Sequence, residues 1–145
     1  MHDDTLLNKS ASIERCVGRA KAEYARDPDT FAQDFTRQDA AILNIQRACE
    51  AALDIGQYLV RRERLGVPQS ARDVFELLHV GGWLSADLAA TMKRMVGFRN
   101  IAVHDYQALQ LPITVNIIRN HLGGFSAFPQ AVLTHEARQP PALPG

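Results

Sequence analysis

The chain has 145 residues, of which 46% are hydrophobic and 22% are charged, and its 16 acidic side chains balance 16 lysines and arginines. This length suits one domain with a substantial core, and a formal net charge of zero argues against a protein that coats nucleic acid through bulk charge. No apolar run approaches the roughly 20 residues of a membrane-spanning helix, and the polar first residues do not resemble a secretory signal, so we expect a cytoplasmic protein without membrane association.

The first predicted element is an amphipathic helix over residues 6–24, where apolar side chains recur at steps of three and four. The sequence Asp-Pro-Asp at 27–29 breaks this pattern. Phe31 and Phe35 follow the break, and we expect both as apolar plugs in the connecting turn.

A long helix is predicted over residues 39–65 by a sustained apolar stripe. Small residues of this helix, such as Ala51, Ala52 and Gly56, would let another helix approach closely, most commonly one of the same chain. Cys16 and Cys49 lie on the apolar faces of the two helices. In a reducing compartment, we expect these cysteines to be small buried apolar side chains rather than a disulfide or a reactive thiol.

Two serines and a proline mark the starts of three further helices. Ser70 and Ser85 are well placed to cap a third and a fourth helix. Pro112 begins a last helix, which the glycine pair at 123–124 would end or kink.

No long β-alternation and no internal repeat is visible in the sequence. We therefore predict an all-α, up-and-down bundle of about five helices over residues 1–133. Residues 134–145 are rich in proline and are expected to form a disordered tail.

The end of the fourth helix concentrates groups that could cleave RNA without a metal. His104 could act as base or acid near neutral pH, and Arg99 offers a permanently charged, planar donor for phosphate oxygens. Asn100 could hydrogen-bond to a ribose or a phosphate. Asp105 could hold the His104 ring in one tautomer or simply face water. Tyr106 could position the phosphate or accept a transferred nucleotide.

Helical geometry limits how these side chains can meet. Each residue of a regular helix advances about 100°, so Arg99 and Tyr106 fall about 20° apart, whereas His104 lies about 140° from Arg99. One straight helix cannot direct all three to one point. We therefore expect a local break between Arg99 and His104, combined with a homodimer whose second copy completes the site.

The pattern Arg99, four residues, His104, one residue and Tyr106 at the end of a fourth helix resembles the HepT-like toxin family of the HEPN superfamily. The resemblance covers roughly residues 5–125. It implies a metal-independent ribonuclease without a cofactor, which dimerises so that both motifs share one cleft.

The same resemblance implies residue roles and a partner. Arg99 and His104 would be catalytic, supported by Asn100, Asp105 and Tyr106. An antitoxin, a MntA-like nucleotidyltransferase, would silence the ribonuclease by transferring AMP to Tyr106.

Other side chains leave alternatives open. An acidic residue of the second helix often lies near the site in related folds, and Glu50 and Asp54 are candidates, although both could equally be solvated charges. The basic residues Lys93 and Arg94 could contact phosphate or remain on a solvated face. The scattered histidines lack the spacing of a metal site, so no metal is expected.

Two other functions fit the same sequence. The main alternative is a non-catalytic helical module that docks a nucleotidyltransferase or binds a nucleotide, and the neutral net charge favours it modestly. The other alternative is a purely structural helical adaptor.

Overall fold

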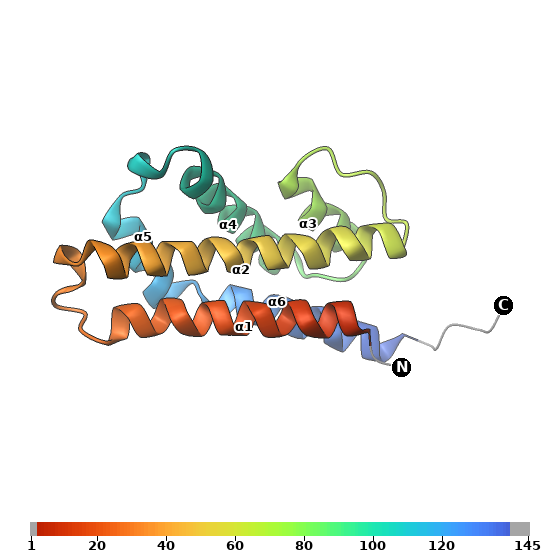
Figure 1. Ribbon diagram of the computed structural model, residues 1–145. Helices are drawn as coiled ribbons and strands as arrows, with labels where there is room; N and C mark the ends of the chain where they lie inside the picture. The colour runs from red at the N-terminus through yellow and green to blue at the C-terminus, as the bar shows by residue number, and fades with distance from the viewer. Residues whose placement is uncertain (1–2, 140–145) are drawn as a thin grey trace.

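A computed structural model describes residues 3–139 and confirms the all-α fold, with six α-helices and two short 3-10 turns in that range. The α-helices are α1 (Asp4–Ala25), α2 (Phe35–Arg62), α3 (Ala71–Val80), α4 (Ala86–His104), α5 (Leu111–Asn120) and α6 (Gly123–Arg138), and the 3-10 turns are η1 (Phe31–Gln33) and η2 (Tyr106–Ala108). In Figure 1, α1 and α2 run antiparallel along each other, α3 and α4 lie on one side of α2, and α6 lies along α1. Within the described residues, no helix is both long and apolar enough to cross a membrane.

A buried arginine holds the turn between α1 and α2. Arg37 is only 5% exposed and donates to the backbone oxygens of Glu23 at 2.8 Å and Asp27 at 2.9 Å. Phe31 is buried beneath the turn as expected, but Phe35 is 75% exposed. The expectation for Phe35 is wrong because this residue is the first of α2 and points outward instead of into the turn.

The close helix approach predicted at Gly56 occurs within the chain. A Cβ atom at Gly56 would lie 2.5 Å from Cγ1 of Val74, so α3 can pack at this distance from α2 only over a glycine. The predicted caps are also present. Ser70 Oγ accepts from the amide of Asp73 at 3.2 Å, and Ser85 Oγ accepts from that of Leu88 at 3.1 Å.

The helix α4 runs without interruption to His104, so the local break expected between Arg99 and His104 is wrong. Phe98 and Ala102 are buried against the bundle, which keeps this part of the helix regular. The chain leaves the helix only at Asp105, whose backbone has φ −151° and ψ 57°. Tyr106 therefore belongs to η2 and does not share a helical face with Arg99.

The last part of the bundle differs from the prediction. A sixth helix, α6, begins at the glycine pair, contains Pro129 and extends to Arg138. It forms because Phe125 and Phe128 are completely buried, and this burial outweighs the local preferences of glycine and proline. Residues 134–138 are thus helical rather than part of the expected tail, and residues 140–145 of that tail lie outside the described residues.

Candidate functional site

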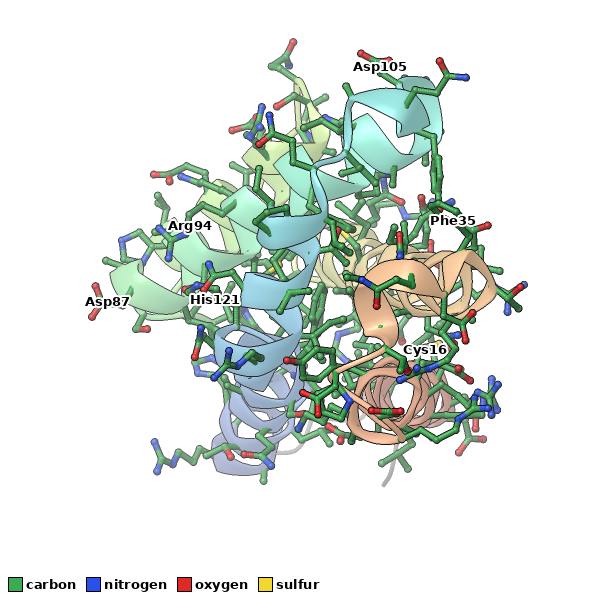
Figure 2. All side chains as sticks on the ribbon, turned by 90° about the vertical axis from the view of Figure 1, so that its left-hand side faces the viewer. Cys16, Phe35, Asp87, Arg94, Asp105 and His121 are labelled. Carbon is green, nitrogen blue, oxygen red and sulfur yellow. The ribbon has the colours of Figure 1, made fainter. Side chains whose placement is uncertain are left out.

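The five candidate residues lie at the end of α4 and in the turn that follows, next to α2. Figure 2 views this end of the bundle, with Asp105 at the outer edge of the turn and Phe35 on the first turn of α2. Side chains from both elements form the contacts described below.

Arg99 is held in place by Glu50 of α2. Nε of Arg99 donates to Oε1 of Glu50 at 2.7 Å, Nη2 lies 3.5 Å from Oε2, and Nη1 donates to Oδ1 of Asn100 at 2.9 Å. The hydrogen bond with Glu50 raises the pKa of Arg99 above its already high ordinary value. These contacts fix the plane of the guanidinium and still leave donors on both terminal nitrogens.

The two acidic candidates of α2 have different partners in the structure. Glu50 contacts the motif through Arg99, whereas Asp54 pairs with Lys9 of α1 at 2.9 Å. Asp54 therefore links α2 to α1 and forms no hydrogen bond or ion pair with a motif residue among residues 3–139.

His104 is exposed at the last position of α4, and neither of its ring nitrogens has a hydrogen-bond partner among residues 3–139. Asp105 is exposed and faces solvent, so it does not hold the imidazole in this structure. Because α4 is regular here, His104 lies about 7.5 Å along the axis from Arg99 and about 140° around it. One copy of the chain does not bring these two side chains together.

Tyr106 is hydrogen-bonded to Asp39 of α2, a residue that no pattern in the sequence indicates as part of the site. The phenol donates to Oδ1 of Asp39, which is 67 positions away in the chain. Burial, the hydrogen bond and the charge of Asp39 together raise the pKa of Tyr106 to about 12. The phenol is therefore protonated at neutral pH, although Tyr106 as a whole is 43% exposed.

Both helices of the site also carry exposed apolar side chains. Phe35 and Leu43 of α2 are 75% and 40% exposed, and Ile101 and Val103 of α4 are 41% and 43% exposed. On α2, steps of four residues place Phe35 and Leu43 on the same face as Asp39. An apolar surface rimmed by polar residues is typical of a contact surface between proteins.

The basic residues of α4 have local partners. Lys93 pairs with Glu76 of α3 at 2.5 Å, and Arg94 donates to the hydroxyl of Thr91 at 3.2 Å. Within the described part of the chain, neither side chain forms a hydrogen bond or ion pair with a motif residue.

The chain matches the family model described as ribonuclease HepT-like over residues 13–132. It is 48% identical, over 126 residues, to the mRNA nuclease HepT of Shewanella oneidensis, an alignment that covers 87% of this chain and 94% of that protein.

Solved structures give the same result. A toxin-antitoxin with AMP-PNP matches with a TM-score of 0.87 and 45% identity, over 91% of this chain and 99% of the other. A tri-AMPylated HEPN toxin of Shewanella oneidensis in complex with MNT antitoxin also has a TM-score of 0.87 and 45% identity, over 92% and 99% of the two chains. The cytosolic protein YutE of Bacillus subtilis, of unknown function, shares the fold at 18% identity, with a TM-score of 0.70 over 91% and 94%.

Proposed function

Because this chain belongs to the HepT-like ribonuclease family, we propose that it is a metal-independent RNA endonuclease and the toxin of a toxin-antitoxin pair. The observation that carries the proposal is the geometry at the end of α4. Arg99 is oriented by Glu50 and keeps free donors, and His104 is exposed with no internal partner among residues 3–139.

These two groups can supply the chemistry of RNA cleavage. A neutral imidazole of His104 takes the proton from a ribose 2′-hydroxyl, and the oxygen attacks the adjacent phosphorus. The bond from phosphorus to the 5′-oxygen breaks, and a protonated imidazole gives its proton to that oxygen. Arg99 stabilises the charge that builds up on the phosphate oxygens. Asn100 accepts from Arg99 and supports its orientation.

The complete site requires two copies of the chain. Arg99 and His104 diverge by about 140° on an uninterrupted helix, so a phosphate bound by one copy needs a further group from a second copy. The exposed apolar residues Phe35 and Leu43 lie on the face of α2 that carries Asp39, the partner of Tyr106, and support a two-fold contact there. We therefore place the RNA in a cleft between two protomers.

Regulation involves Tyr106 and a nucleotidyltransferase antitoxin. The related Shewanella oneidensis toxin is tri-AMPylated and is found in complex with MNT antitoxin. In this chain Tyr106 is partly exposed and follows His104 by two positions. AMP on its phenol oxygen would add bulk and negative charge beside His104, where the RNA phosphate binds. AMP transfer by a MntA-like antitoxin would thus block cleavage.

Cleavage of RNA by the purified protein in the presence of EDTA tests the proposal. We expect His104→Ala and Arg99→Ala to abolish cleavage and growth inhibition while size-exclusion chromatography still shows the parent's oligomeric state. His121→Ala removes another exposed imidazole outside the site and serves as the matched control. Full activity of both site variants would overturn the assignment.

Mass spectrometry after co-expression with the antitoxin tests the regulation separately. We expect the parent to gain AMP on Tyr106, and Tyr106→Phe to gain none there. An inactive complex with unmodified Tyr106 would show that the antitoxin acts by occlusion instead.

A further inference from the structure

A glycine on α4 creates a seat for an arginine from α3. A Cβ atom at Gly97 would lie 2.9 Å from Nη2 of Arg72, so the guanidinium rests on α4 where no side chain intervenes. Nε of Arg72 also donates to the backbone oxygen of Lys93 at 3.3 Å. Arg72 belongs to the first turn of α3, and these two contacts direct its side chain across to α4.

The charge of Arg72 is not neutralised within the described residues. The nearby acids have other partners, because Glu76 pairs with Lys93 and the carboxylate of Asp73 accepts from the amide of Gln69 at 2.9 Å. Arg72 is exposed and forms no ion pair with any residue from 3 to 139. Its terminal nitrogens are therefore available to an external anion.

Helical geometry places this cation in line with Asn100 and His104. Lys93, Gly97, Asn100 and His104 follow one another at steps of four, three and four, which puts them within about 60° on one face of α4. The Arg72 guanidinium, seated over Gly97, therefore lies on the same face as Asn100 and His104. Seven residues separate Gly97 from His104, a distance of about 10 Å along the helix axis.

We propose that Arg72 binds a phosphate of the RNA that flanks the cleaved bond, so that the RNA strand follows this face of α4. The inference rests on the proposed ribonuclease function. A guanidinium suits this role because its planar set of donors matches the oxygens of a phosphate. Because Gly97, where the guanidinium lies, is about 10 Å from His104 along the helix axis, Arg72 would contact a flanking phosphate and fix the position of the strand.

The test measures binding of a single-stranded RNA oligonucleotide by fluorescence anisotropy at several salt concentrations. His104→Ala is the parent in this assay because it does not cleave the probe. Adding Arg72→Ala should weaken binding about tenfold at low salt. It should also reduce the slope of log affinity against log salt by about 0.7, the value for one phosphate contact on a single strand.

Two further variants separate the seat of the guanidinium from its charge. Gly97→Ala keeps every charge but places a methyl group 2.9 Å from Nη2 of Arg72. The flexible arginine can shift to avoid it, so this variant should weaken binding by less than Arg72→Ala does. Arg15→Ala removes an exposed charge from α1, across α2 from this face, and should bind like the parent. Circular dichroism checks that all variants keep their helix content.

The outcomes distinguish the inference from the function on which it rests. If Arg72→Ala binds RNA with the parent's affinity and salt slope, the role of Arg72 is overturned. The role is also overturned if Arg15→Ala weakens RNA binding as much as Arg72→Ala does. Full binding by Gly97→Ala overturns the seat on α4. Loss of the antitoxin complex with unchanged RNA binding would assign Arg72 to the protein partner. A parent that binds no RNA overturns the ribonuclease proposal together with this one.

Discussion

Glu50 of α2 orients Arg99 of α4 through a contact along one edge of the guanidinium, with Nε to Oε1 at 2.7 Å and Nη2 to Oε2 at 3.5 Å. The Glu50 side chain is 41% exposed, and ion pairs this open to solvent add little to folding stability. The main effect of the contact is therefore to fix the orientation of the Arg99 guanidinium. Glu50 is a positioning residue in this interpretation.

Replacing Glu50 by glutamine should lower kcat for RNA cleavage by about fivefold to tenfold, because the charged guanidinium then bonds to a neutral amide oxygen instead of a carboxylate, and this contact is weaker by about 1 kcal/mol. The KM and the melting temperature should change little. Asp54→Asn is the matched control, since Asp54 is one turn further along α2 and pairs with Lys9 instead of a motif residue. Equal losses of kcat in both variants would contradict the positioning role.

The pKa of Tyr106 provides a second test of the site. Burial and Asp39 raise this pKa to about 12, so Asp39→Asn should bring it down toward the ordinary value of about 10. The sign follows from charge, because the carboxylate of Asp39 disfavours a second negative charge on the phenol. NMR titration of carbon-13-labelled tyrosine rings measures the shift, with Tyr106→Phe to assign the signal.

Tyr58 is the internal control in the same spectra. Its pKa is raised by the hydrogen bond to Asp3 at the other end of the bundle, and Asp39→Asn should leave it unchanged. A Tyr106 signal that titrates identically in the parent and in Asp39→Asn would show that the two side chains are not in contact in solution.

Much of the fold could be predicted because local signals and burial agree. Ser70 and Ser85 are good caps, and each is followed by an apolar stripe, so the predicted starts of α3 and α4 are confirmed. At α6 the two kinds of signal conflict, since glycines and Pro129 disfavour a helix while Phe125 and Phe128 require burial. From the local signal, the sequence predicts that the helix ends or kinks at the glycines. In the structure, burial of the two phenylalanines stabilises a helix that begins there.

The site shows the same division between local and long-range information. The motif from Arg99 to Tyr106 is contiguous, so its place at the end of α4 could be predicted. Asp39 lies 67 positions from Tyr106, and no spacing rule links the two. Glu50 and Asp54 are separated by one helical turn, and only the packing of α4 and α1 shows which of them faces Arg99.

Asp3 should make stability depend on acid pH. Burial alone would raise the pKa of this carboxyl, but hydrogen bonds from Tyr58, the Leu6 amide and Arg62 lower it below its ordinary value. The folded state therefore favours the charged form. The resulting stabilisation is present above the unfolded pKa of about 3.9 and is lost as the pH falls through the lower folded pKa.

Asp3→Asn isolates this contribution, because asparagine also caps a helix and so retains the cap of α1. Urea unfolding should show a free energy of unfolding lower than the parent's by about 1 kcal/mol at pH 7, with the difference shrinking below pH 4. A difference that stays constant from pH 7 to pH 2.5 would show that the charge of Asp3 is not involved.

Gly56 and Gly18 form a matched pair that tests how α3 is seated on α2. Alanine at Gly56 would place its Cβ 2.5 Å from Val74, so α3 must shift, and we expect a loss of about 1–3 kcal/mol in the free energy of unfolding. Gly18 is in the middle of α1, where an added Cβ atom would have nothing within 4 Å, so Gly18→Ala should stabilise by about 0.5–1 kcal/mol. Because α3 also carries Arg72, Gly56→Ala should weaken RNA binding as well, whereas Gly18→Ala should not. Urea unfolding measures the change in stability, and the anisotropy assay measures the change in RNA binding. A Gly56→Ala protein as stable as Gly18→Ala would contradict the close packing of α3 on α2.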